Sequence, residues 1–147
     1  MARTTTLGSI ETRVRRDLVN DFEPDSYRWS VIQVMSQIRA MILDVAFNHN
    51  AWAAYDQDTG KRYYDIETSL APVKAAADAA PDVARSNEDG GTFDESLRAI
   101  VMPIDDRYAE AVANLVAARL LETDNSDTAN ANRSAYFQTK GKELAAR

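Results

Sequence analysis

Residues 104–146 read IDDRYAEAVANLVAARLLETDNSDTANANRSAYFQTKGKELAA and contain two helical patterns in succession. In the first pattern, apolar side chains recur at helical spacing from Tyr108 to Leu120. Asp105 or Asp106 stands at its start, where a negative charge complements the helix dipole. The polar break 123–127 precedes a second pattern, whose apolar and small positions include Ala129, Ala131, Ala135, Tyr136, Phe137 and Leu144. We therefore expect a pair of consecutive helices around which the rest of the chain is organised.

The first helix of this pair is apolar on nearly every side. Between residues 109 and 121 the exceptions are Glu110, Asn114 and Arg119. A helix without a polar face is a buried helix, so we expect more than its own small bundle to cover it. This pattern predicts a homo-oligomer.

Two more helices are expected in the first third of the chain. The first begins after Thr6, a candidate N-cap, and carries one apolar stripe made of Leu7, Ile10, Val14 and Leu18. After a connector at residues 20–28, Ser30 and Gln33 have the spacing of a capping box. The helix that follows carries a wide apolar stripe, Val31, Val34, Met35, Ile38, Met41, Ile42 and Val45.

A cluster of arginines lies on or beside the opposite face of the first helix. It comprises Arg13, Arg15 and Arg16. Such a cluster is usually a solvated face, and the functional alternative is a docking site for an acidic partner.

The middle of the chain predicts β structure. Residues 52–66 carry aromatic side chains on both sides of a polar loop that contains Gly60, which is typical of a β-hairpin. The apolar run 97–102 predicts a third strand, and three strands form a more stable unit than two. Residues 70–84 are rich in alanine and predict a short helix. The aromatic side chains either pack on their own domain or form an interface with another subunit or a partner through Trp52, Tyr55, Tyr63 and Tyr64.

These elements predict a mainly α fold, a bundle of about four main helices with a small β-hairpin or three-stranded insertion in its middle. A chain of 147 residues has the size of one ordinary domain with one core. We expect a helical half, a β-containing insertion, a core helix and a C-terminal docking helix, at residues 1–50, 51–102, 103–126 and 127–147.

The sequence contains no recognisable set of catalytic or cofactor-binding residues. Cysteine is absent and His49 is the single histidine, so the common zinc ligand sets cannot form. There is also no glycine-rich phosphate loop and no serine in a nucleophile-elbow sequence. We therefore expect no catalytic residue, no cofactor and no metal, and we predict that the protein is not an enzyme.

Membrane insertion and secretion are not expected either. No apolar run approaches the length of a membrane span. Residues 1–6 lack the apolar core and the cleavage site of a signal peptide.

Charge is distributed unevenly along the chain. The net charge is −6, whereas residues 1–20 and residues 127–147 each carry +2, which leaves −10 for the middle. An acidic body binds duplex DNA poorly, because neutralisation of phosphates drives that affinity. The distribution suits a surface that DNA passes without sticking, or basic ends that dock on an acidic partner. A soluble acidic domain without either role has the same pattern.

Two groups of segments form a recognisable set. Near the start these are LGSIETRVRRDL at 7–18 and RWS at 28–30. In the last third they are MPIDDRY at 102–108, AARLL at 117–121 and DTANANRSAY at 127–136. Together these segments resemble the head-to-tail adaptor (connector) proteins of tailed bacteriophages. The resemblance covers roughly the first 50 and last 50 residues, and its motifs are helix-packing patterns.

The resemblance implies a structural protein of the virion neck that is assembled in the host cytoplasm. Family members form a ring, usually of twelve subunits, that docks on the portal protein, extends the DNA channel and provides a platform for a tail, nozzle or tail-terminator protein. Double-stranded DNA then passes through without sequence-specific binding. Family members commonly dock their C-terminal segment on the portal, which here implies the docking residues Arg133, Tyr136, Phe137, Lys140, Lys142 and Arg147.

Two other functions remain as alternatives. One is a regulatory or chaperone-like helical module that binds another protein through the aromatic hairpin. The other is a small hydrolase that uses paired carboxylates, since acidic residues are plentiful.

Overall fold

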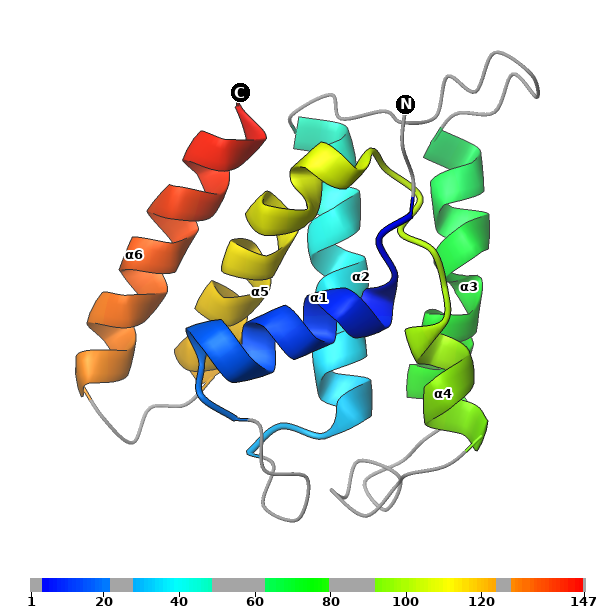
Figure 1. Cartoon of the computed structure of the whole chain (residues 1–147), viewed down its shortest axis with the longest axis horizontal. Coiled ribbons are helices and arrows are strands. Elements are labelled where there is room, and N and C mark those ends of the chain that lie inside the picture. The colour runs from blue at the N-terminus through cyan, green and yellow to red at the C-terminus, as the bar shows by residue number, and fades with distance from the viewer. Residues whose placement is uncertain (1–3, 22–27, 49–62, 80–91, 124–127, 147) are drawn as a thin grey trace.

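The computed structural model describes residues 4–21, 28–48, 63–79, 92–123 and 128–146. Within these ranges the chain is mainly helical, as the sequence predicts (Figure 1). The α-helices are α1 (Leu7–Arg13), α2 (Val31–Asn48), α3 (Tyr63–Ala79), α4 (Thr92–Arg98), α5 (Ala109–Thr123) and α6 (Thr128–Ala145). A π-helix, η1 (Val14–Leu18), continues α1, and a 3₁₀ turn, η4 (Asp106–Tyr108), leads into α5.

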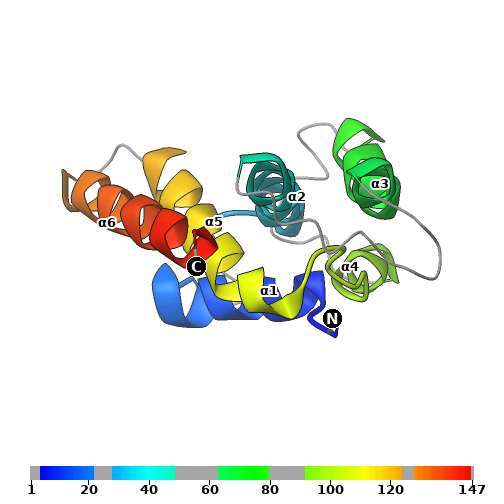
Figure 2. The ribbon, with the colours of Figure 1, turned by 90° about the horizontal axis from the view of Figure 1, so that it is seen from above.

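The helices form two layers. Helices α6, α5, α2 and α3 lie in this order across the molecule, and α5 packs against both α6 and α2 (Figures 1 and 2). Helices α1 and α4 cover one face of that layer, and α1 crosses α2 and α5 (Figure 2). One cluster of buried apolar side chains runs from Leu7 to Ala145 and joins the two layers.

Both helix starts predicted in the first third are confirmed. Thr6 caps α1, and the Thr6 and Ser9 side chains each accept a hydrogen bond of 3.2 Å from the other residue's backbone N–H. The Ser30 N–H donates to Gln33 Oε1 at 2.8 Å, and the Gln33 N–H donates to Ser30 Oγ at 3.2 Å. These reciprocal bonds satisfy backbone donors that a helix leaves free at its start.

The β-hairpin prediction is wrong for its second arm. Tyr63 and Ile66 lie in α3, and the remaining hairpin residues, 52–62, lie outside the described ranges. The side chains buried along α3 are Ile66, Leu70, Val73 and Ala76. Their spacing is that of one helical face, so burial against α2 overrides the strand preference of the aromatic residues. The alanine-rich helix is confirmed as the second half of this longer one, up to Ala79.

The third predicted strand is also wrong. Leu97 and Arg98 end α4, and Val101 makes only an isolated antiparallel bridge with Thr6. Two backbone bonds flank the bridge, from the Leu7 N–H to the Ile100 carbonyl at 2.9 Å and from the Met102 N–H to the Thr5 carbonyl at 2.7 Å. The described residues therefore contain no strand, and this short pairing fixes the chain before α1 beside the chain before α5.

Helix α5 is buried as predicted, but the protein's own helices cover it. Ten of its residues are buried within the single chain: Ala111, Val112, Ala113, Asn114, Leu115, Val116, Ala117, Ala118, Leu120 and Leu121. The polar side chain among them, Asn114, donates to the Glu110 carbonyl at 2.8 Å. The burial of α5 therefore gives no argument for another subunit, and the oligomer stays a prediction.

Small residues let α6 approach α5 closely. The buried positions of α6 are Asn130, Ser134, Gly141 and Ala145, with Phe137 and Leu144 half-buried beside them. The Ser134 hydroxyl donates to the Ala118 carbonyl at 2.8 Å. A Cβ on Gly141 would lie 2.6 Å from Leu115 Cγ and 3.2 Å from the Ala111 carbonyl oxygen, so this position has no room for a side chain.

We predict that Gly141→Ala destabilises the protein, although alanine favours a helix over glycine by about 1 kcal/mol. Overpacking against Leu115 should cost about 1–3 kcal/mol and outweigh that gain. Urea unfolding measures the change, with Thr139→Ala on the exposed side of α6 as the matched control. A Gly141→Ala variant as stable as the wild type would contradict the close approach.

Candidate assembly surface

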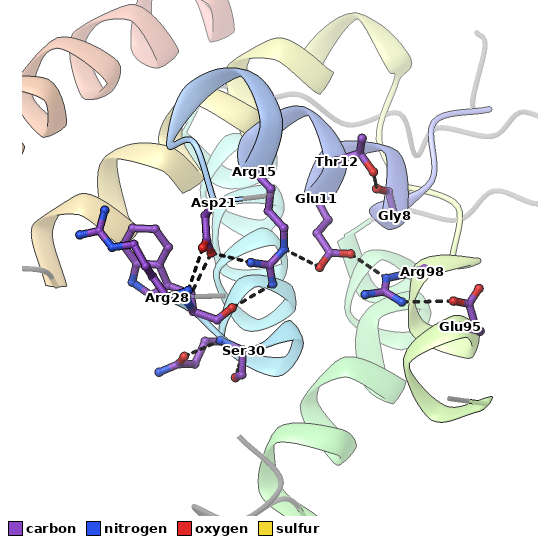
Figure 3. A network of polar contacts seen from close by, with 11 residues as sticks. Gly8, Glu11, Thr12, Arg15, Asp21, Arg28, Ser30, Glu95 and Arg98 are labelled. Atoms are coloured by element: carbon purple, nitrogen blue, oxygen red, sulfur yellow. Dashed lines mark hydrogen bonds and ion pairs between the residues drawn. The ribbon is translucent and has the colours of Figure 1, made fainter. Parts of the chain in front are cut away.

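A buried arginine joins several elements of the domain, among them η1, to which Arg133 of α6 is hydrogen-bonded. Arg15 in η1 is only 3% exposed. Its Nε lies 2.9 Å from Glu11 Oε2 and its Nη1 lies 2.7 Å from Asp21 Oδ2 (Figure 3). Its Nη2 donates to the Trp29 carbonyl at 3.0 Å. The interpretation of the arginine cluster as a solvated face is therefore wrong for Arg15, because Glu11 lies one turn before it on the helix and the connector after η1 brings Asp21 to it.

The two carboxylates have further partners, which extend the cluster. Asp21 Oδ1 accepts from the Arg28 N–H at 2.7 Å, and Glu11 Oε1 lies 2.8 Å from Arg98 Nε (Figure 3). Arg98 also reaches Glu95 at 3.1 Å, near the end of α4. The Arg15 cluster, which we define as Glu11, Arg15, Asp21 and Arg98, thus joins α1, η1, the start of α2 and α4.

The other arginines of α1 and η1 lie at the surface. Arg13 is half-exposed and pairs with Glu110 of α5 through Nε at 2.8 Å and Nη2 at 3.1 Å. It also lies 3.0 Å from Asp17. Arg16 is exposed. The solvated-face prediction therefore holds for Arg16, while Arg13 ties α1 to α5.

Asp106 anchors the chain before α1. Its carboxylate accepts from the Thr4 and Thr5 N–H groups at 2.9 Å and from the Thr4 hydroxyl at 2.7 Å. Burial alone would raise the pKa of Asp106, but these hydrogen bonds outweigh it and lower the pKa to about 2. Asp105, the neighbouring residue, caps η4 by accepting from the Arg107 N–H at 2.9 Å.

The structure divides the residues predicted to dock on the portal. Arg133 Nη2 donates to the Leu18 carbonyl at 2.6 Å, and Phe137 packs against the core, so both hold α6 on the domain. Tyr136 is 62% exposed, and Lys140 follows it on the same flank of α6. Lys142 is not on this flank, since it lines a groove on the opposite side of α6, and Arg147 lies outside the described residues.

The groove lies between α2, α5 and α6 and has a volume of about 500 Å³. Its buried apolar floor consists of Met41, Leu115 and Ala118. Its rim carries polar and charged side chains, Asp44, Asn48, Arg119, Glu122, Gln138 and Lys142. Sequence reasoning missed this groove, because its walls come from three helices. The one local signal is the spacing of Met41, Asp44 and Asn48, which puts them on one face of α2.

The residues predicted to form an aromatic interface are described only in part, so that interface stays a prediction. Trp52 and Tyr55 lie outside the described residues, as does His49. Tyr63 and Tyr64 belong to the first turn of α3 and not to a hairpin.

We predict that Arg15→Met lowers the free energy of unfolding by about 3–5 kcal/mol, because it leaves the buried Glu11 and Asp21 without their shared cation. Guanidinium unfolding measures the loss. Arg16→Met removes the same charge from an exposed neighbouring position and should change stability by no more than about 0.5 kcal/mol. Equal effects of the two substitutions would show that the Arg15 cluster does not stabilise the fold.

The lowered pKa of Asp106 gives a pH dependence. The unfolded chain protonates this carboxylate near its ordinary pKa of 3.8, whereas the folded protein does so only near about 2. The stabilisation is therefore complete above about pH 5 and is lost as the pH falls towards about 2.

Urea unfolding at a series of acidic pH values checks this. The stability of the wild type should fall more steeply between about pH 5 and 2 than that of Asp106→Asn, which lacks the titrating group. Glu122→Gln at an exposed position is the control and should keep the wild-type slope. Identical slopes for the wild type and Asp106→Asn would refute the anchoring role.

Comparisons with known proteins add no family assignment: no protein-family model, curated protein or solved structure matches the chain. In the described ranges, no group of three or more histidine, cysteine, aspartate or glutamate side chains is placed to hold a metal ion. None of the helices described is long and apolar enough to cross a membrane.

Proposed function

We propose that the protein is a head-to-tail adaptor subunit of a tailed bacteriophage, which forms a ring on the portal and connects it to tail components. The observation that carries the proposal is the placement of α6 at the edge of the layer, with one narrow face on α5 and the rest exposed (Figure 2). The sequence resemblance supplies the identity of the assembly, and α6 supplies a surface suited to it.

The exposed part of α6 is suited to docking because it is large, polar and firmly supported. Its positions 131, 132, 135, 136, 138, 139, 142 and 143 are all exposed, so no described part of the chain uses them. The Arg133–Leu18 bond connects α6 to η1, which the Arg15 cluster fixes. A partner that binds α6 is therefore connected to the whole domain, because α6 is fixed to the domain and is not a free terminal segment.

The charge of the C-terminal segment favours an acidic partner. Residues 127–147 carry a net charge of +2 on a protein of net charge −6. Complementary charge raises the association rate and selects the orientation of docking. The acidic remainder has little affinity for phosphates, which suits a conduit that DNA must pass.

The alternative of a binding module built on an aromatic hairpin loses its structural basis. Tyr63 and Tyr64 lie in α3, so the four aromatic residues do not form the two arms of a hairpin. We therefore do not propose it as a second function.

We expect Lys142→Glu to weaken attachment to the isolated portal at least several-fold, because the substitution reverses a charge on the exposed side of α6. Point substitution is preferable to truncation here, since α6 packs on the core as far as Ala145. Co-sedimentation and mass photometry of portal mixed with each variant measure attachment and ring formation. Lys74→Glu on the exposed face of α3 is the control with the same charge change.

Two results would contradict the proposal. One is a wild-type protein that never joins a portal particle under any assembly condition. The other is an equal effect of Lys142→Glu and Lys74→Glu on portal attachment, which would show that the docking surface is not on α6. Monomers in free solution are compatible with the proposal, because a template can be needed for assembly.

A further inference from the structure

We propose that the groove between α2, α5 and α6 is the binding site for a second copy of this chain, which inserts the Tyr136 side of its own α6. We call Tyr136, Lys140 and Glu143 the Tyr136 face. The inference rests on the proposed function, because it assumes that the subunits assemble into a ring, and it identifies the contact between neighbouring subunits. It is argued from the exposure of Tyr136, the floor of the groove, the charges on both and their positions on α6.

Tyr136 has the properties of an interface anchor. It is 62% exposed, the largest exposed fraction among the large hydrophobic residues described. Its ring meets the Phe137 ring edge-on, with 5.4 Å between the centroids. Because Phe137 packs against the core, the Tyr136 ring has a fixed support on one side. Burying a supported aromatic ring costs little side-chain entropy, and tyrosine is enriched among the residues that dominate binding energy.

The groove offers the matching cavity. Its floor of Met41, Leu115 and Ala118 is apolar and belongs to residues that the fold already buries. Its volume of about 500 Å³ is in the range of pockets that enclose small ligands, so it accommodates one aromatic side chain. Methionine in such a floor adapts to the shape of the inserted group and makes favourable sulfur contacts with a ring.

The charges on the two surfaces are complementary. Lys140 and Glu143 follow Tyr136 at four and seven residues, so both lie on its side of α6. The rim of the groove carries two anions, Asp44 and Glu122, and two cations, Arg119 and Lys142. In the described structure, Arg119, Glu122 and Lys142 make no ion pair and no hydrogen bond through their side chains. In the proposed contact, Lys140 of one copy therefore pairs with Glu122 or Asp44 of the neighbouring copy, and Glu143 pairs with Arg119 of the neighbouring copy.

The two surfaces lie on opposite flanks of α6. Gln138 and Lys142 face α2 across the groove, whereas Arg133 and the Tyr136 face lie towards η1. In Figure 2, α1 covers one face of the α5–α6 pair, whereas α2 lies beside α5 in the same layer. One copy therefore cannot offer both surfaces to the same partner in a two-fold dimer. Repetition of this contact is heterologous and produces a ring or a filament.

This contact gives separate roles to the α6 residues. Arg133 and Phe137 hold the helix on its own domain, whereas Tyr136, Lys140 and Glu143 bind the groove of the neighbouring subunit, whose rim includes Lys142.

Cysteine cross-linking tests the contact directly, since the natural chain contains no cysteine. Lys140→Cys is placed in one copy and Glu122→Cys in a second copy with a different tag. The two are mixed at about 1 mM, so that even a weak contact is populated, and treated with a short bismaleimide. We expect a cross-linked heterodimer at least several-fold above the yield of Lys74→Cys mixed with Glu122→Cys. Lys140→Cys alone should give no more homodimer than Lys74→Cys alone.

A second variant separates the contact from chance proximity. Adding Tyr136→Ala to the Lys140→Cys copy should reduce the yield of heterodimer to the level of the Lys74→Cys control. A thermal melt of this double variant should still show a folded protein. The inference is overturned if the Lys140–Glu122 pair cross-links no better than the control. It is also overturned if Lys140→Cys alone forms the dominant dimer, which would indicate a two-fold contact. Portal attachment of the Tyr136→Ala variant is scored independently, so failure of this contact and failure of the adaptor proposal give different results.

Discussion

The ion pairs around Arg15 are the constraint on which the rest of the structure depends. A guanidinium buried without partners is severely destabilising, so the chain must bring acceptors to it from several directions. Glu11 comes from the same helix, Asp21 and the Trp29 carbonyl come from the connector and the start of α2, and Arg98 joins through Glu11. The cluster therefore determines where four separate segments meet. Lysine could not replace Arg15, since a single ammonium lacks the planar fork that serves three acceptors at once.

The π-helix is the local feature that makes this cluster possible. In η1 the Val19 N–H bonds to the Val14 carbonyl at 2.9 Å, five residues back, and the Asp21 N–H bonds to the Arg15 carbonyl at 2.6 Å. These wide turns are uncommon and concentrate where a side chain must be redirected. Asn20 follows with a φ of 55°, a left-handed conformation that asparagine tolerates better than most residues. Together they reverse the chain within a few residues and place Asp21 beside Arg15.

The sequence predicts the features of this fold that arise from neighbouring residues. The N-cap at Thr6, the capping box at Ser30 and the stripes of α2 and α5 were predictable, because helical spacing and caps are local. The strands failed because aromatic and β-branched residues near Tyr63 and Val101 favour strands locally, whereas burial of Ile66 and Leu70 against α2 requires a helix. The burial of Arg15 and the groove beside Leu115 were not predictable, since their partners lie on segments far apart in the chain. The resemblance implies Tyr136 and Lys142 together as docking residues, and only the packing of α6 shows that they lie on different flanks of the helix.

The small residues between α5 and α6 have a consequence for temperature. On the α6 side, the buried positions are Asn130, Ser134, Gly141 and Ala145, which contribute little apolar area, and the larger Phe137 and Leu144 are only half-buried. The heat capacity of an opening reaction scales with the apolar area that it exposes, so separating α6 from α5 changes it less than unfolding the α2–α5 core does. A small heat-capacity change gives a nearly straight dependence of free energy on temperature. The free energy that holds α6 on α5 therefore follows a straighter line with temperature, between cold and warm conditions, than the free energy of unfolding of the core beneath it.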